Sequence, residues 1–369
     1  MTTPTTTPTP AESRGTNDIA ELRQFIGVHA ANQNIEPALL DRVLAGIGND
    51  LEGDPASWAV QWTREAQEAG ARGDLPAAGA MAALARFPFV DGPARATAAR
   101  VGIDAFTQWA APTPLRDLRV ESGQGALRLW TAGLSTSEPR PLVVLLGGIV
   151  APKEQYAPVL LQLDQLGLAG VVAELPGVGE NTWHYDEGSW QLFPAVLDAL
   201  ADRARVDRTH VVALSFSGHL ALRAAAHDDR IRGVVTAGAP VREFFQALRE
   251  DGGAAIPRVT RDTLGHLLGC APGELAERTR GWELTDDELS APAIPVRYIV
   301  SSRDEIVPPA EAEVLRAQVK DLELLTHDDV HGSPAHVAAS RTWCVLSVLR
   351  LLGGYDPVVA QLETALAGL

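Results

Sequence analysis

The sequence predicts an α/β protein in which a mostly parallel, doubly wound sheet follows an all-helical region. In residues 113–369, apolar strand-like runs alternate with helical patterns, as they do where helices cover both faces of a parallel sheet. In residues 17–112, apolar residues recur at spacings of three and four without a convincing strand. The chain has 369 residues, of which 46% are hydrophobic, so it can bury the cores of a large domain and an accessory one.

The balance of charges is strongly acidic. A formal net charge of −16 argues against nucleic-acid and anionic-membrane partners, which need a basic surface, and favours a small neutral or apolar ligand. Segment 1–16 is rich in Thr and Pro and lacks the basic and apolar regions of a signal peptide, so we predict a disordered tail. No stretch approaches the roughly 18 consecutive apolar residues of a membrane span, and we therefore predict a cytoplasmic protein.

Neither the cysteines nor the histidines indicate a metal or redox site. Cys270 and Cys344 are far apart in the sequence and lie in apolar contexts, which favours buried free thiols over a disulfide framework. The nine histidines form no HxxxH pair and no cluster with carboxylates at ligand spacing. No GxGxxG pattern opens a helix after a strand, so a dinucleotide site is not indicated either. We expect no metal and no cofactor.

Residues 17–112 are predicted to form a helical N-terminal cap domain. The helical periodicity is clearest in "DIAELRQFIGVHAAN", "PALLDRVLAGI", "PASWAVQWTREAQEAG" and "PAAGAMAALARF". The prolines of Ala111–Leu115 mark the boundary with the domain that follows, residues 113–369. The apolar helices are compatible with a homodimer and equally with packing on that second domain.

The strands of the second domain follow in order. Alternation in "RDLRVESGQGALRLWTAG" predicts a hairpin with its turn near Gly123–Gly125. Six further strands are predicted at Leu142–Leu146, Ala169–Glu174, His210–Leu214, Gly233–Ala237, Val296–Val300 and Leu322–Thr326. Residues 241–292 contain only helix-like patterns between two of these strands. Because an insertion at the carboxyl ends of parallel strands lies over the ligand crevice, we interpret it as a lid.

The stretch "ALSFSG" places Ser215 where an apolar strand turns into an alanine-rich helix. A tight strand-to-helix turn lifts a serine hydroxyl above the sheet, and the amide of the next residue, Phe216, then points at a developing oxyanion. Such a turn needs small residues two positions before and after the nucleophile. Ala213 and Ser217 satisfy this for Ser215. With Ser217 as the nucleophile, the second flank would be the bulky His219, and a serine that only caps the helix is a further alternative.

Two later segments supply an acid and a base for this serine. Asp304 follows a strand in "YIVSSRDEIVPP", where Glu305 is the less favoured acid and a simple turn or cap is the alternative. His331 lies in "LELLTHDDVHGSPAHVAAS", in a loop between the last strand and the last helix. His331 would take the serine proton as general base while Asp304 holds the imidazole tautomer. Two competitors are less favoured, because His327 is too near the strand end and His336 opens the final helix.

A second oxyanion donor is expected after the third strand, in "VVLLGGIVAPKEQY". Gly147 and Gly148 allow the backbone to come close to an acyl oxygen. The amide of Ile149 or Val150 would then join that of Phe216 as the donor pair. A glycine pair that only turns a strand into a helix is the alternative.

Two segments near the expected crevice carry side chains suited to contact a ligand. The loop "ELPGVGENTWHYDEGSW" follows the fourth strand, and the insertion 241–292 contains apolar residues suited to line a cavity. The candidates are Trp183, His184, Tyr185 and Asp186 in the loop and Phe244, Phe245, Leu248 and Leu264 in the insertion. The alternatives are surface decoration for the loop and internal packing for the insertion.

Five segments together resemble the α/β-hydrolase superfamily, and within it the FrsA-like esterases and 2,6-dihydroxypseudooxynicotine hydrolase, which join a helical N-terminal domain to the hydrolase core. The segments are "LGGIVAPKEQY", "ELPGVGEN", "ALSFSGHLALRAAA", "SSRDEIVP" and "VHGSPAH", in the expected order between residues 142 and 336. The resemblance implies a Ser-Asp-His hydrolase whose substrate lies between the core and the helical cap. The chain departs from the group at Val150, where an acidic residue is frequent, and at Ala213 and Ser217, where glycines are usual. The first departure favours acyl chemistry over carbon–carbon hydrolysis.

Three hypotheses about function follow. The first is a serine hydrolase that cleaves an ester or related acyl bond of a medium-sized, largely apolar small molecule in natural-product metabolism. The second uses the same fold to eliminate an acyloxy group such as acetate, or to transfer an acyl group, in a biosynthetic pathway of the tetronate or polyketide type. The third is a non-catalytic binding protein whose helical region docks a partner.

Overall fold

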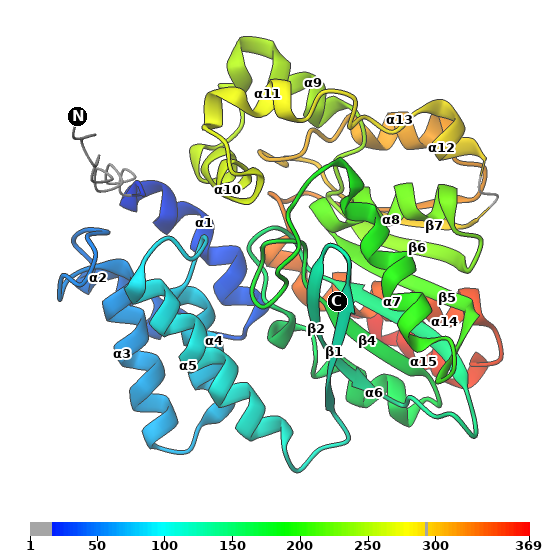
Figure 1. The fold of residues 1–369 in the computed structure, drawn as a ribbon, viewed down its shortest axis with the longest axis horizontal. Helices are drawn as coiled ribbons and strands as arrows, with labels where there is room; N and C mark the ends of the chain where they lie inside the picture. The colour runs from blue at the N-terminus through cyan, green and yellow to red at the C-terminus, as the bar shows by residue number, and fades with distance from the viewer. Residues whose placement is uncertain (1–16, 292–293) are drawn as a thin grey trace, which may run out of the picture.

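The computed structural model describes residues 17–291 and 294–369, and the predicted tail of residues 1–16 lies outside these ranges. The strands are β1 (Arg116–Ser122), β2 (Gly125–Ala132), β3 (Arg140–Leu146), β4 (Ala169–Ala173), β5 (Ala204–Leu214), β6 (Ile231–Ala237), β7 (Val296–Ser301) and β8 (Leu322–His327). They form one eight-stranded sheet in the order β1-β2-β4-β3-β5-β6-β7-β8 (Figure 1). β2 pairs antiparallel with β1 and β4, and the other neighbours are parallel. The predicted mostly parallel sheet is confirmed.

Strand β5 starts at Ala204, well before the predicted start at His210. Its first half is mostly polar and partly exposed, so it lacks the apolar run that marks the second half. Backbone pairing with Arg140 and Pro141 of β3 holds this first half in the sheet, across a register shift before Leu142. Pairing with a neighbouring strand, rather than the hydrophobic pattern, therefore sets the start of β5.

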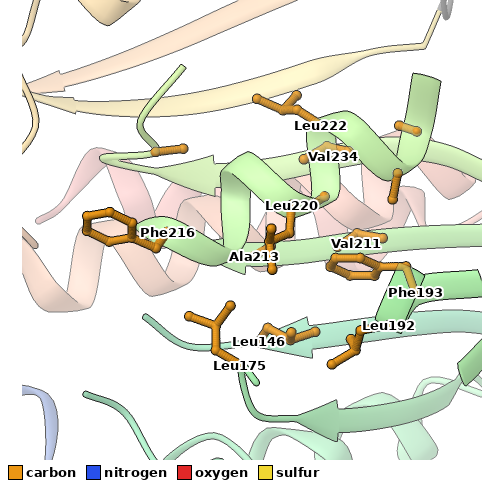
Figure 2. Packing of buried hydrophobic residues seen from close by; sticks show 14 of the residues in the cluster. Leu146, Leu175, Leu192, Phe193, Val211, Ala213, Phe216, Leu220, Leu222 and Val234 are labelled. Carbon is orange, nitrogen blue, oxygen red and sulfur yellow. The ribbon is translucent and has the colours of Figure 1, made fainter. Parts of the chain in front are cut away.

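Helices cover both faces of the sheet. They are α6 (Val159–Gln165), α7 (Leu192–Leu200), α8 (Phe216–His227), α13 (Glu311–Gln318), α14 (Val337–Leu352) and α15 (Asp356–Ala367). In β3, Val144 packs in the core on the α7 and α8 side, whereas Val143 packs on the α6 and α14 side. Figure 2 shows the first of these cores, where Leu146 and Ala213 lie beside Leu220 of α8. None of the helices in the described residues is long and apolar enough to cross a membrane.

The N-terminal region is helical and has a core of its own. Its helices are α1 (Ile19–Asn32), α2 (Pro37–Gly46), α3 (Trp58–Ala71), α4 (Leu75–Ala85) and α5 (Pro93–Ala110). Trp58 and Trp62 of α3 are fully buried in this core. Asp18 caps α1 by accepting hydrogen bonds from amides of the first turn. The region stands to one side of the sheet (Figure 1), and Phe106 of α5 contacts Trp130 of β2 edge to face, which ties the two together.

Residues 241–291 are the described part of the predicted insertion, and they contain helices but no strand. Its α-helices are α9 (Glu243–Arg249), α10 (Arg258–Leu268), α11 (Leu275–Arg278) and α12 (Asp286–Ser290), and it also contains the short 3₁₀ helices η3 (Glu250–Gly253) and η4 (Pro272–Glu274). Elsewhere in the described chain the 3₁₀ helices are η1 (Lys153–Gln155), η2 (Glu187–Gln191) and η5 (Pro334–His336). α10 reaches the N-terminal region, because Val259 belongs to the core of that region and His266 stacks on Phe89 with 4.5 Å between ring centroids. The insertion and the N-terminal helices therefore meet (Figure 1), while the interpretation of the insertion as a lid stays a prediction.

Glu311, the first residue of α13, anchors the start of the insertion. Its buried carboxylate accepts hydrogen bonds from the backbone amides of Val241 and Arg242 at 2.8 Å and of Phe244 at 3.0 Å. These amides surround the beginning of α9, where helical N–H groups have no partner within the helix. The contact therefore holds the first turn of α9 against the sheet domain.

We expect Glu311→Gln to lower the free energy of unfolding by about 2 kcal/mol. The carboxylate has two oxygens that accept hydrogen bonds from three backbone amides, whereas the Gln side chain has one acceptor oxygen. Thermal unfolding followed by circular dichroism measures this change. Glu313→Gln is the matched control, since Glu313 is an exposed residue of the same helix, and it should leave the stability nearly unchanged. Equal losses in the two variants would contradict the anchoring role.

Candidate active site

Ser215 stands at the turn between β5 and α8. It lies between Leu214, the last residue of β5, and Phe216, the first of α8, with φ 56° and ψ −130°. This conformation is strained for a residue with a side chain, and such strain concentrates at functional sites. The amide of Ser215 donates to the carbonyl of Ala237 at 2.8 Å, and its carbonyl accepts from the amide of Gly218 at 2.8 Å. The local geometry is that of a nucleophile elbow.

Three loops at the carboxyl ends of the parallel strands bring Ser215, His331 and Asp304 together. Oγ of Ser215 lies 3.1 Å from Nε2 of His331, and Nδ1 of His331 lies 2.8 Å from Oδ2 of Asp304. Oδ1 of Asp304 also accepts backbone hydrogen bonds from Ile306 at 2.9 Å and Val307 at 2.8 Å, which fix the carboxylate. Because Nδ1 faces a carboxylate, it carries the imidazole proton, and Nε2 is left to accept the proton of Ser215.

The environment of His331 makes it a suitable base. Only 15% of its side chain is exposed, and this desolvation by itself would lower the pKa. The charge and hydrogen bond of Asp304, with a smaller contribution from Glu305, outweigh desolvation and raise the pKa of His331 above its ordinary value of 6.5. Glu305 also accepts a hydrogen bond from the backbone amide of His331 at 3.0 Å. The raised pKa favours the imidazolium that forms when His331 accepts a proton.

The alternative residues weighed from the sequence have other partners. The fully buried hydroxyl of Ser217 donates to two backbone carbonyls inside the core. His327 shares a hydrogen bond with Ser340, and His336 shares one with Asp329. In the described structure none of the three alternatives hydrogen-bonds to the candidate nucleophile.

Gly238 packs directly under the acid and the base. Its φ is +55°, and a Cβ here would stand 2.9 Å from Cε1 of His331 and 3.2 Å from Oδ2 of Asp304. We expect Gly238→Ala to lower kcat for an ester by about 10- to 100-fold, because the displaced side chains lose their alignment. Steady-state kinetics with a 4-nitrophenyl ester measures the effect. Gly167→Ala is the matched control, since Gly167 also has a positive φ but faces open space, and it should affect stability alone. A Gly238→Ala enzyme with the kcat of Gly167→Ala would contradict this packing.

The loop after β3 brings backbone amides close to Ser215. In the turn that begins at Gly148, the amide of Ala151 donates to the carbonyl of Gly148 at 3.2 Å. The amides of the two central residues, Ile149 and Val150, take no part in this hydrogen bond. A Cβ on Gly148 would lie 3.2 Å from Cβ of Ser215, so glycine permits the close approach. The amide of Phe216 opens α8, where no earlier helical carbonyl accepts it. The predicted oxyanion donors therefore stay the amide of Phe216 and the amide of either Ile149 or Val150.

A cavity of about 990 Å³ lies beside the candidate triad. Ser215 and His331 line it together with the predicted oxyanion residues Gly148, Ile149, Val150 and Phe216. Further walls come from α1, α4 and α5 of the N-terminal region, from α10 of the insertion and from α14. Its volume lies within the range of small-molecule sites, about 300–1,000 Å³. The N-terminal region therefore forms part of the candidate site.

The structure does not place at this cavity the side chains predicted to contact a substrate. They are Trp183, His184, Tyr185, Phe244 and Phe245. The Trp, Tyr and two Phe side chains are buried in the core that packs against the sheet, whereas His184 is exposed to solvent. An apolar side chain in a loop or helix looks the same in sequence whether it fills a core or lines a pocket. From the insertion the cavity instead receives Val259, Thr260 and Thr263 of α10.

Sequence reasoning misses two polar residues that the N-terminal region contributes to the cavity, His29 of α1 and Arg86 after α4. Burial, together with the charges of His331 and Arg86, lowers the pKa of His29 to about 4, so this imidazole is neutral. Each residue interrupts an otherwise apolar helical pattern, in "FIGVHAA" and "AALARF". A polar residue on an apolar helical face is the signal that marks them.

A buried ion cluster supports the loop that carries the predicted oxyanion amides. Lys153 is 1% exposed, and its ammonium lies 2.9 Å from Glu154, 3.3 Å from Glu174 and 2.7 Å from Glu180. Burial outweighs the attraction of Lys153 and raises the pKa of Glu174 to about 7. Among the described residues no group of three or more His, Cys, Asp or Glu side chains is arranged to hold a metal ion. In this cluster the ammonium of Lys153 supplies the positive charge.

The chain is similar to a known protein family and to several solved structures. The family model described as esterase FrsA-like matches residues 22–284. Two solved structures of AbyA5 are 48% and 45% identical, with TM-scores of 0.91 and 0.86, and each match covers 95% of this chain and 99% or 98% of AbyA5. The crystal structure of 2,6-dihydroxy-pseudo-oxynicotine hydrolase shares the fold at 17% identity, with a TM-score of 0.67 over 91% of this chain and 93% of that one. No curated protein matches the sequence.

The family match covers the part of the candidate site that contains Ser215 and ends before Asp304 and His331. Residues 22–284 include the N-terminal helices, the loop after β3 and the elbow at Ser215. The similarity to AbyA5 extends over nearly the whole length of both chains. The chain belongs to the FrsA-like esterase family of α/β-hydrolases.

Proposed function

We propose that the protein is a serine hydrolase that cleaves an ester or related acyl bond of a medium-sized, largely apolar small molecule. One observation carries the proposal: the hydrogen-bonded series Ser215, His331 and Asp304 stands at a strained turn and borders a cavity of about 990 Å³. A nucleophile, a base that reaches it and a group that orients the base are the parts that covalent acyl chemistry needs. Membership of the FrsA-like esterase family supports the same reaction class.

In the proposed reaction, Oγ of Ser215 attacks the acyl carbon while Nε2 of His331 accepts its proton. Positive charge develops on the imidazole, and the fixed carboxylate of Asp304 stabilises it. The negative oxygen of the tetrahedral intermediate is held by the amide of Phe216 and an amide of the turn after β3. His331 then returns the proton to the leaving alkoxide. Water, deprotonated by the same imidazole, finally hydrolyses the acyl-enzyme.

The walls of the cavity limit the substrate in size and polarity. Apolar side chains such as Phe87, Val90 and Ile306 contribute to the lining of the cavity. Helices of the N-terminal region and α10 stand around the same space, so a polymer or a folded protein does not fit. A compact molecule with a large apolar part matches both the size and the polarity of the cavity.

Labelling with a fluorophosphonate tests the proposed function. The wild-type protein is expected to form a covalent adduct at Ser215, located by mass spectrometry, whereas folded Ser215→Ala is expected to form none. A series of 4-nitrophenyl esters of increasing chain length then defines the acyl size that the cavity accepts. Absence of both an adduct and ester cleavage by folded wild-type protein would contradict a hydrolase and favour a binding protein.

Elimination of an acyloxy group such as acetate is a second candidate reaction, and one observation favours it. His29 presents a second imidazole to the cavity that His331 lines, and its pKa of about 4 keeps this imidazole neutral. An elimination needs a base that takes a proton from carbon, while donors hold the departing carboxylate. His29 or His331 would accept the proton as the C–H and C–O bonds break and an alkene and a carboxylate form.

Reaction in oxygen-18 water separates the two reactions. Hydrolysis yields an alcohol and places one labelled oxygen in the carboxylate product. Elimination yields an alkene and an unlabelled carboxylate. An alcohol product with label in the acid supports the proposed hydrolase, and an alkene without label replaces it by the second candidate.

A further inference from the structure

Arg86 is a charged residue of the cavity wall with most of its hydrogen-bonding capacity unused. It is 5% exposed and lines the same cavity as Ser215. Its Nη1 donates to the carbonyl of Val150 at 2.7 Å. Nε is buried without a partner, and Nη2 donates to no acceptor among the described residues. Because a guanidinium carries five N–H donors, one contact leaves donors for a ligand in the cavity.

The acidic side chains of the cavity are held by other partners. Glu154 and Glu174 form ion pairs with Lys153 at 2.9 Å and 3.3 Å. Glu305 accepts a hydrogen bond from a backbone amide of the loop that carries the candidate base. In residues 17–291 and 294–369, no carboxylate lies within ion-pair distance of Arg86. Burial lowers the pKa of Arg86, and the charges of Glu174 and Glu154 oppose this only from a longer range.

A buried guanidinium without a carboxylate partner is unfavourable, because it has lost water and gained no counter-charge. A bound anion removes that penalty. The planar arrangement of guanidinium N–H groups binds a carboxylate through two parallel hydrogen bonds, which an ammonium group does not match. The contact with Val150 fixes one edge of the group, so the remaining donors are held in place before a ligand enters.

We propose that Arg86 binds an anionic oxygen of the substrate, such as a carboxylate, so that the substrate is a largely apolar molecule with one acidic group. The inference rests on the proposed function, because it takes the cavity as the substrate site. Arg86 belongs to the N-terminal region and Ser215 to the sheet domain. The acidic group and the scissile bond are therefore held by different domains, and the distance between them selects the substrate.

Binding to the inactive full-length Ser215→Ala protein tests this proposal without any turnover. Isothermal titration compares 4-phenylbutyrate with 4-phenylbutyramide, which differ in charge but hardly in shape. We expect the carboxylate to bind at least about tenfold more tightly than the amide, and Arg86→Gln in the same background to reduce this ratio to about one. Arg341→Gln is the matched control. Arg341 also lines the cavity but donates to the carbonyl of Asn32, and its loss should preserve the ratio.

The ratio distinguishes ligand binding from a structural role. If Arg86 only holds the carbonyl of Val150, its replacement weakens both ligands equally. Equal affinities in Ser215→Ala, no carboxylate binding at millimolar concentration, or a preference that survives Arg86→Gln would each overturn the proposal. Arg86→Lys serves as a second variant should Arg86→Gln fail to fold, because it keeps the charge and should retain part of the preference. A folded Arg86→Lys protein without any preference also overturns the anion site.

The outcome is separate from that of the fluorophosphonate test. A protein that prefers the carboxylate through Arg86 but forms no covalent adduct has the anion site and is not a serine hydrolase. A protein that forms the adduct but binds both ligands equally is a hydrolase without the anion site.

Discussion

Ser215→Ala is expected to lower kcat for ester hydrolysis by about a million-fold, because it removes the nucleophile of the acyl-transfer step. The substitution deletes one side-chain oxygen atom. The backbone amide and carbonyl of residue 215 keep their hydrogen bonds to Ala237 and Gly218, so the fold should persist. Affinity for an unreactive ligand should change little, since the cavity wall loses only the hydroxyl. Steady-state kinetics with 4-nitrophenyl butyrate and isothermal titration with a non-hydrolysable analogue measure the two effects.

Ser217→Ala is the matched control for this prediction. The Ser217 hydroxyl donates to the carbonyls of Leu146 and Leu214 at 3.2 Å and 2.9 Å inside the core. Its removal is expected to cost about 1 kcal/mol of stability and to leave kcat within about tenfold of the wild type. Loss of activity in Ser217→Ala together with retained activity in Ser215→Ala would show that the nucleophile assignment is wrong.

Asp304→Asn is expected to lower kcat by about ten-thousand-fold. The carboxylate of Asp304 lies 2.8 Å from Nδ1 of His331 and stabilises the imidazolium that forms when Ser215 loses its proton. An amide at this position lacks the charge and favours the wrong imidazole tautomer. Rapid-quench or steady-state kinetics at saturating ester measures the loss.

The pH profile gives Asp304→Asn a second readout. The neutral imidazole is the base, so kcat/KM falls as pH is lowered through the pKa of His331. In the wild type the charge of Asp304 outweighs burial and keeps this pKa above 6.5, which puts the acid limb of the profile above pH 6.5. Without that charge burial dominates, and the acid limb of the residual activity moves to lower pH.

Glu305→Gln is the control for the charge effect. Its amide oxygen can still accept the hydrogen bond from the backbone amide of His331, while the smaller contribution of its charge is lost. A small shift of the acid limb toward lower pH and a kcat within about tenfold of the wild type are expected. An acid limb that does not move in Asp304→Asn would contradict the role of Asp304 in raising the pKa of His331.

Much of the site could be predicted because each candidate residue occupies a recognisable local position. Ser215 ends an apolar run and precedes a helix, Asp304 follows a strand, and His331 lies in a loop between a strand and a helix. Parallel strands end at one edge of the sheet, so residues at their carboxyl ends converge even when they are distant in sequence. The apolar runs themselves are readable because strands such as β3 are buried on both faces.

The cavity wall could not be predicted in this way. Phe244 and Phe245 have the composition expected of a pocket, yet they pack in the core beside α8. His29 and Arg86 reach the cavity from helices of the N-terminal region, although they lie more than a hundred residues before Ser215 in the chain. Their contribution depends on how the N-terminal helices pack on the rest of the chain.

By itself, the sequence determined the class of the fold, the order of its strands along the chain and the three residues proposed to react, because these follow from local patterns and from the geometry of parallel sheets. Only the tertiary structure decided the order of strands across the sheet, the early start of β5 at Ala204 and the side chains that surround the cavity. The physical reason is that burial and pairing depend on which distant surfaces meet, and side chains of the same type serve a core in one place and a binding site in another.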